Sequence, residues 1–250
     1  MTKTDEGRML IDRGEKGLYI SFRHRSGTEG LVVLLPGLAC SKESFEGAWE
    51  CDALAGYSLL AFDFPGFGAS DKPEGFFYGL EDHAKVCEAV IRSFPGQEVH
   101  IVGHSMGAAI GLLLSDTFLV SIRSFVNAEG NLIGDDCSLM SRAAINVSYE
   151  TFGQKIYQDL AVRFDKYCNW AATSPRAFYL SAQSLVAWSD SGSLLERFRS
   201  LGCRKAYFYG ERSSGIQVLE HLADIERREI GASGHFMMQD NATDFYRGVA

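Results

Sequence analysis

The chain has 250 residues, 46% of them hydrophobic, and its 24 Lys and Arg against 32 Asp and Glu give a formal net charge of −8. A chain of this length can bury one full-sized core, so we expect a single domain with at most a small appendage. The acidic excess argues against nucleic acid as a partner, because nothing would replace the counterions around its phosphates.

The cysteines and the N-terminus restrict the class of protein further. The six cysteines are scattered, without a Cys-x-x-Cys pair or a histidine cluster at metal-ligand spacing, which predicts reduced, mostly buried thiols and no metal. Residues 1–8 are polar and lead into no long apolar run. We therefore predict neither a secretory signal nor a spanning helix, and a soluble, cytoplasmic protein with no membrane partner.

The first half of the chain alternates strands with helices. A strand over 18–25 precedes the apolar run 31–35, whose uninterrupted character is typical of a strand buried on both faces. Further on, the pattern predicts helices over 44–54, 80–94 and 108–115, and strands over 57–62, 99–102 and 120–126. This order predicts an α/β fold with a doubly wound, mostly parallel sheet.

Between about 131 and 190 the pattern changes to aromatic-rich helical segments over 138–146, 149–163 and 176–188. Strand character returns at 205–209 and, more weakly, at 226–230. We predict a core formed by 1–130 and 191–250 with a helical lid inserted at 131–190. The lid aromatics favour an apolar roof over a pocket, although aromatics at helical spacing also pack a lid onto a core.

Ser105 is the strongest candidate for a nucleophile. It lies in Gly103-His-Ser-Met-Gly107, a Gly-x-Ser-x-Gly motif placed between a predicted strand and a predicted helix. The two glycines allow the tight turn that a side chain would block. The structural alternative, an ordinary glycine-flanked turn, does not explain the strand before the motif and the helix after it.

A serine hydroxyl needs a base to remove its proton as it attacks. His235, in a glycine-bearing loop after the last predicted strand, is the predicted base. The remaining histidines are interpreted as surface or packing residues; they are His24, His83, His100, His104 and His221.

The carboxylate that orients the base is less obvious. Glu129 ends the strand before the predicted lid, at the edge of a parallel sheet where site groups collect. Its role would be to hold the tautomer of His235 and stabilise the imidazolium. Glu211, in the loop after the strand that follows the lid, stays open as the alternative.

The negative oxygen formed on attack needs two backbone N–H donors, worth roughly 3 to 4 kcal/mol each. We predict the N–H of Met106, directly after the nucleophile, and that of Leu38, in the loop after 31–35. For the Pro36-Gly37 pair beside Leu38, a plain turn is the structural alternative.

At four landmarks the sequence resembles the α/β-hydrolase superfamily over essentially its whole length: 34–38, 62–70, 103–107 and Gly234-His235. Two departures stand out. Pro36 replaces the usual histidine before the oxyanion-loop glycine, and a serine stands where the aspartate after the lid is usual. An acid at the end of the pre-lid strand is similar to haloalkane dehalogenases and some epoxide hydrolases, which use an aspartate nucleophile instead of a serine. The resemblance implies a serine esterase-like enzyme without a cofactor.

The predicted function is hydrolysis of a small carboxylic ester, thioester or lactone with an apolar portion, through an acyl-enzyme on Ser105. Two alternatives stay open: carbon–carbon bond hydrolysis by the same triad, and a non-catalytic relative that keeps the fold as a ligand pocket.

Overall fold

A computed structural model describes residues 4–12 and 17–250. Residues 1–3, part of the polar N-terminal segment for which no secretory signal is predicted, lie outside the described residues. None of the helices in these ranges combines the length and the apolar character needed to cross a lipid bilayer.

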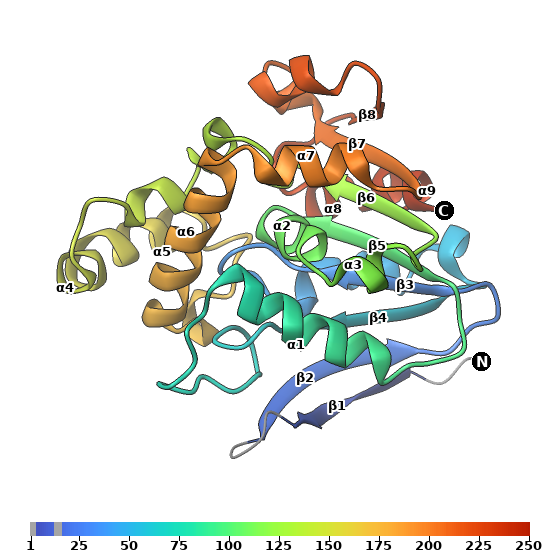
Figure 1. Cartoon of the computed structure of the whole chain (residues 1–250), viewed down its shortest axis with the longest axis horizontal. Coiled ribbons are helices and arrows are strands. Elements are labelled where there is room, and N and C mark those ends of the chain that lie inside the picture. The colour runs from blue at the N-terminus through green and yellow to red at the C-terminus, as the bar shows by residue number, and fades with distance from the viewer. Residues whose placement is uncertain (1–3, 13–16) are drawn as a thin grey trace.

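One sheet runs through the described part of the chain, with eight strands in the order β1-β2-β4-β3-β5-β6-β7-β8 (Figure 1). The pairs from β4 to β8 are parallel, whereas β1 and β2 pair antiparallel with each other and β2 pairs antiparallel with β4. The mostly parallel sheet predicted from the alternating pattern is therefore confirmed. The strands are β1 Thr4–Ile11, β2 Leu18–Arg25, β3 Leu31–Leu35, β4 Ser58–Phe62, β5 Val99–His104, β6 Ser124–Ala128, β7 Arg204–Gly210 and β8 Glu226–Ile230.

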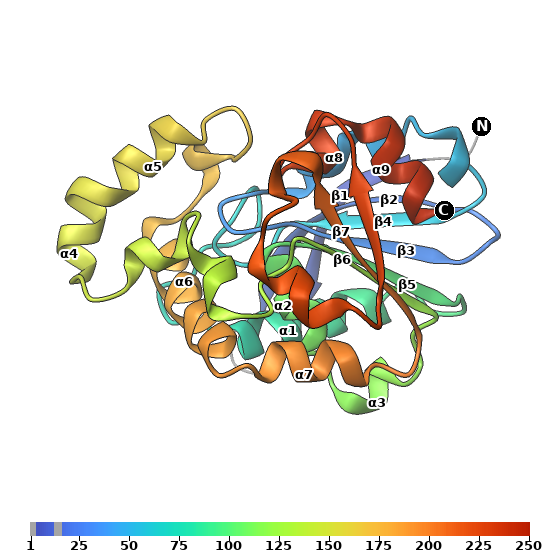
Figure 2. The same ribbon diagram turned by 90° about the horizontal axis from the view of Figure 1, so that it is seen from above.

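Helices cover both faces of the sheet. Figure 2 shows α1, α2, α3 and α7 on one face and α8 and α9 on the other, so the sheet is doubly wound. The helices are α1 Leu80–Arg92, α2 Met106–Leu112, α3 Asp116–Leu119, α4 Tyr149–Thr151, α5 Tyr157–Arg163, α6 Pro175–Asp190, α7 Ser193–Ser200, α8 Met237–Asp240 and α9 Ala242–Val249. A π-helical turn, Phe152–Ile156, joins α4 to α5. The 3₁₀ helices are Lys42–Ala48, Asp52–Leu54, Gly134–Cys137, Ser141–Ala144, Trp170–Ala172, Glu211–Ser213 and Gln217–Leu222.

The central strands are buried as their sequences predict. All five residues of β3 and all five of β4 are buried, which suits strands that are covered by helices on both faces. The carboxyl ends of the parallel strands β3, β5, β6 and β7 consequently meet at one edge of the sheet.

Several predicted elements differ in detail. The helix expected over 44–54 is two 3₁₀ helices, Lys42–Ala48 and Asp52–Leu54. The strand expected over 120–126 is wrong at its start: the Ser115 hydroxyl caps α3 by accepting from the N–H of Phe118, and Val120 at the other end of this helix is 85% exposed. Strand β1 is absent from the prediction because it is the outermost strand, and its mostly exposed, partly charged residues show little hydrophobic pattern.

Between β6 and β7 the chain leaves the sheet for the helical elements that end with α6 at Asp190. Figures 1 and 2 both show α4 and α5 projecting beyond one end of the sheet. An aromatic cluster holds this segment together: the rings of Phe152 and Phe178 stack at 5.4 Å, and Tyr157 meets Trp170 at 5.2 Å. The Tyr157 hydroxyl also donates to the backbone carbonyls of Trp170 and Thr173.

Candidate active site

Ser105 occupies the sharp turn between β5 and α2. Its φ of 50° and ψ of −122° place a non-glycine residue in the sparsely populated region of positive φ, at a typical cost of about 1–3 kcal/mol. A Cβ added to Gly107 would lie 2.2 Å from the carbonyl oxygen of Leu35, and one added to Gly103 would lie 2.4 Å from the Cα of Ala108. Both glycines are thus required by close backbone approach.

Glu129 and His235 meet across the carboxyl edge of the sheet. His235 Nδ1 and Glu129 Oε2 lie 2.8 Å apart, and the N–H of Gly210 donates to Glu129 Oε1 at 2.9 Å. Glu129 directly follows β6 with a φ of 43°, a second strained residue at this edge. His235 follows β8 in the loop that leads to α8.

The environment of Glu129 keeps its carboxyl group ionised. Burial alone would raise the pKa of Glu129, but hydrogen bonds from His235, Gly210 and the Ser213 side chain bring the pKa below its ordinary value. Ser213 occupies the position where the family aspartate is missing. In this chain that position supports the carboxylate of Glu129 and supplies none of its own.

Glu211, the alternative acid, has a different partner. Its Oε2 accepts a hydrogen bond from the N–H of Ala232 at 2.7 Å, and the residue is exposed. The carboxylate therefore ties the loop before His235 to the end of β7. The hydrogen bond to the imidazole belongs to Glu129.

Ser105 and His235 line the same small cavity, but the described hydrogen bonds of Ser105 do not include one to the imidazole. The Ser105 hydroxyl instead donates to Oδ1 of Asn131 at 3.3 Å. Asn131 is 3% exposed and comes two residues after Glu129. Sequence reasoning missed this residue, although its position just past a strand end is a signal that could have found it.

His104 is a second residue whose contact was missed. Its Nε2 lies 3.0 Å from the backbone oxygen of His235, and the two rings are 4.7 Å apart. Burial, reinforced by the neighbouring His235, lowers the pKa of His104 well below its ordinary value. A neutral His104 can donate this hydrogen bond and hold the loop that carries His235.

The predicted N–H donors flank the nucleophile. Met106 is the first residue of α2, where a backbone N–H has no partner within the helix. Leu38 lies in the turn closed by the hydrogen bond from Cys40 N–H to the Gly37 oxygen, and it lines the cavity with Ser105. Both backbone groups therefore lie beside Ser105, where an oxyanion hole would be needed.

The segment 131–190 supplies most of the cavity wall. Its contributions are Asn131, Asp136, Leu139, Met140, Ser141 and Leu185. The space open to a water-sized molecule is about 10 Å³, close to the minimum for one water. The apolar side chains that line the cavity are aliphatic, so the expected aromatic roof is replaced by the alternative of packing: Phe152 stacks on Phe178 within the segment, and Tyr167 stacks on Phe236 of the core at 4.3 Å.

The segment 131–190 also contacts the loop after β3. The N–H of Asn169 donates to the Ala39 oxygen at 3.0 Å, and the sulfur atoms of Cys40 and Cys168 lie 3.5 Å apart as free thiols.

All six cysteines are free, and Cys87 and Cys137 are also buried. Within residues 4–12 and 17–250, no group of three or more His, Cys, Asp or Glu side chains is placed to hold a metal ion.

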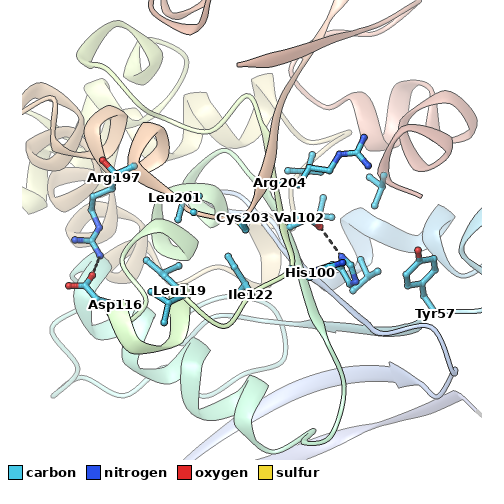
Figure 3. A pocket seen from close by; sticks show the side chains of 18 of the residues that line it. Tyr57, His100, Val102, Asp116, Leu119, Ile122, Arg197, Leu201, Cys203 and Arg204 are labelled. Carbon is cyan, nitrogen blue, oxygen red and sulfur yellow. Dashed lines mark hydrogen bonds and ion pairs between the residues drawn. The ribbon is translucent and has the colours of Figure 1, made fainter. Parts of the chain in front are cut away.

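A much larger hollow of about 940 Å³ lies elsewhere (Figure 3). It is lined by Val32, His100, Ser124 and Arg204, which stand at or near the first residues of β3, β5, β6 and β7. Because these strands are parallel, the hollow is at the edge of the sheet opposite Ser105 and Glu129. Size does not make it the candidate active site, since the strained serine and the carboxylate–imidazole pair are at the other edge.

The strand order and the sharp strand–serine–helix turn define a protein of the α/β-hydrolase class. A family model described as the alpha/beta hydrolase fold matches residues 30–242. The chain belongs to this family.

Similar proteins of known name match only in part. A mesoderm-specific transcript homolog protein from Bos taurus is 32% identical over 100 residues, 38% of this chain and 30% of that protein. A probable lysophospholipase, BODYGUARD 4 of Arabidopsis thaliana, is 45% identical over 60 residues, 24% of this chain and 14% of that protein. The matched part of the chain thus spans less than a third of the length of either relative.

Solved structures share the fold over nearly the whole chain. A mutant of the N-acyl homoserine lactonase AidH, complexed with N-hexanoyl homoserine, has a TM-score of 0.76 at 15% identity and covers 99% of this chain and 95% of its own. An esterase from Exiguobacterium antarcticum has a TM-score of 0.73 at 17% identity, covering 96% and 97%. These likenesses confirm the fold.

Proposed function

We propose that this chain is a serine hydrolase that cleaves a small carboxylic ester, thioester or lactone through an acyl-enzyme on Ser105. The observation that carries the proposal is the part-buried Glu129–His235 hydrogen bond at 2.8 Å, together with a strained serine that lines the same cavity as His235. A buried carboxylate with a shifted pKa and a specific partner, as Glu129 is, is typical of catalytic sites. The names of an esterase, a lactonase and a probable lysophospholipase among the similar proteins agree with it.

In the proposed first step, His235 takes the hydroxyl proton of Ser105 as Oγ attacks the acyl carbon. Glu129 stabilises the imidazolium, and the N–H groups of Met106 and Leu38 bind the negative oxygen. His235 then gives its proton to the departing alcohol or thiol. Because the Ser105 hydroxyl now points to Asn131, its rotation toward His235 precedes attack.

In the second step, water attacks the acyl carbon while His235 takes one of its protons. The bond between the acyl carbon and Oγ breaks, Oγ recovers the proton from His235, and the carboxylic acid leaves. No cofactor is needed to balance either step.

The cavity favours a substrate with a compact apolar portion. Leu38, Leu139, Met140 and Leu185 surround the space beside Ser105. Because that space fits about one water, we propose that residues 131–190 act as a lid that moves to admit substrate.

The test is turnover of a panel of short p-nitrophenyl esters, thioesters and lactones by the wild-type protein and by Ser105→Ala. We expect Ser105→Ala to lose about 10⁴-fold or more in kcat and to lose labelling by a fluorophosphonate, while its circular dichroism is unchanged. Equal turnover by both proteins would refute the assignment. Activity confined to diketone-like substrates would select carbon–carbon hydrolysis, and failure of the wild type to label would favour a non-catalytic pocket.

A further inference from the structure

Asn131 makes two kinds of contact at the candidate site. Its Oδ1 accepts from the Ser105 hydroxyl at 3.3 Å, while its Nδ2 donates to the backbone oxygen of Asp136 at 2.8 Å and lies 3.6 Å from Cys137 Sγ. A backbone carbonyl can only accept, so the amide nitrogen must face Asp136. The oxygen must then face Ser105, and the orientation of the amide follows from its partners.

The loop that carries Asn131 is held closed by its own hydrogen bonds. Oδ2 of Asp136 accepts from the N–H groups of Leu132 at 2.8 Å and Ile133 at 3.0 Å. With the Asn131 amide, three bonds thus tie 131–133 to Asp136. Asn131 Oδ1 is consequently presented to the nucleophile by a preorganised loop, two residues beyond Glu129.

The cavity beside this oxygen matches a single water in size and in chemistry. Its volume is about 10 Å³, and its lining includes Ser105, Asn131 and His235. A bound water needs roughly that volume and at least two polar partners. An amide acceptor and an imidazole on one water-sized space meet both needs.

We infer that Asn131 positions the water that hydrolyses the acyl-enzyme, an inference that rests on the proposed function. Once Ser105 is acylated, Oγ has no proton and no longer donates to Oδ1, so a buried acceptor is left to be satisfied. A water that donates one hydrogen to Oδ1 can present its other hydrogen to His235. It then attacks the acyl carbon, His235 takes the second hydrogen as a proton, and Oγ recovers that proton as its bond to carbon breaks.

The test is the lifetime of an acetyl group on Ser105, followed by intact mass after mixing with p-nitrophenyl acetate. In Asn131→Ala we expect the acetyl group to decay about tenfold more slowly than in the wild type. Both kcat and KM should fall together, with kcat/KM held within about threefold, since acylation does not use this water. A burst of nitrophenolate and a near wild-type rate of fluorophosphonate labelling should accompany the change.

Cys137→Ala is the matched control, because it removes a neighbour of Asn131 Nδ2 and leaves Oδ1 in place; its acetyl lifetime should stay within about twofold of the wild type. If Asn131→Ala does not fold, Asn131→Ser, with a shorter acceptor, should lengthen the lifetime in the same direction. Two results would overturn the role of Asn131 and leave the proposed function standing. One is an acetyl lifetime in folded Asn131→Ala that equals the wild-type lifetime; the other is a fall in kcat/KM with KM unchanged. Absence of any acetyl on Ser105 in the wild type would overturn the proposed function and this inference with it.

Discussion

At the scale of single residues, the candidate site joins two strained positions. Ser105 and Glu129 both have positive φ, at 50° and 43°, and both directly follow strands of the sheet. Strain of this kind persists only where the surroundings hold it in place. Here the N–H of Ser105 donates to the Ala128 oxygen and the N–H of Glu129 to the Phe208 oxygen, so neighbouring strands hold both residues.

Glu129→Gln tests which carboxylate orients His235. We expect kcat to fall about 10³–10⁴-fold, because a neutral amide neither stabilises the imidazolium nor holds the required tautomer. Glu211→Gln removes a carboxylate bonded only to the N–H of Ala232 among its described contacts, so it should cost at most about tenfold. Steady-state kinetics on one ester compares the two variants. A larger loss for Glu211→Gln would show that the wrong acid has been chosen.

How far the site can be read from the sequence depends on how local its signals are. The five-residue Gly-x-Ser-x-Gly motif is enough to predict Ser105 as the nucleophile, and the end of the strand before residue 129 is enough to suggest Glu129 as the acid. The supporting contacts depend on the tertiary fold instead. Ser213 is brought to Glu129 by the pairing of β6 with β7, and His104 is brought to His235 by the packing of the loop after β8. No local pattern encodes contacts across 84 or 131 residues, so these residues were not predictable in their roles.

At the scale of elements, strands were easier to predict than helix boundaries. Continuous apolar runs located β3 and β4, whereas polar β1 and the short α3 were missed because propensity and pattern are weak there. The sequence predicts no helix or strand for the loop 131–137. It is in fact an ordered turn that brings Asn131 and Asp136 to the cavity.

Asp136 makes this loop sensitive to pH. Burial, with the charges of Glu129 and Asp135, raises its pKa to about 6 despite the hydrogen bonds from Ile133 and Leu132. The unfolded chain releases this proton near pH 4, so the folded state holds more protons between about pH 4 and 6. The contribution of Asp136 to stability therefore declines as pH rises through that window.

Asp136→Asn should remove this decline, since an amide oxygen can still accept from Leu132 and Ile133. Relative to the wild type, the free energy of unfolding of the variant should increase from pH 4 to pH 6.5, by at most about 1.4 kcal/mol per pH unit. Urea denaturation at four pH values measures it, with Asp159→Asn, an exposed position on α5, as the control for losing a carboxylate. A difference that does not change with pH would contradict the account.

At the scale of the whole molecule, the site is closed while a larger hollow is open at the opposite edge of the sheet. The sequence could indicate an insertion at 131–190 but not that it closes over the serine, because closure depends on how α6 and the 3₁₀ helices pack on the core. In the proposed mechanism, this aliphatic wall limits the size of the acyl group that can be accommodated once the lid has moved.

Met140→Ala tests this control of size. Met140 is 5% exposed and lines the cavity, so its truncation should raise the ratio of kcat/KM for p-nitrophenyl butyrate over acetate about tenfold. Met9→Ala, on the edge strand β1, is the control and should leave the ratio unchanged. The same ratio in all three proteins would mean that this cavity does not receive the acyl group.

In the proposed mechanism, the oxygen of Ser105 carries the acyl group during turnover. The most direct measurement is acid quenching of the protein during hydrolysis of a short ester, followed by digestion and mass spectrometry of the peptide that contains residues 103–107. We expect the mass of one acyl group on Ser105, with none in Ser105→Ala. Steady ester turnover with that peptide unmodified, or with the acyl group on another residue, would contradict it.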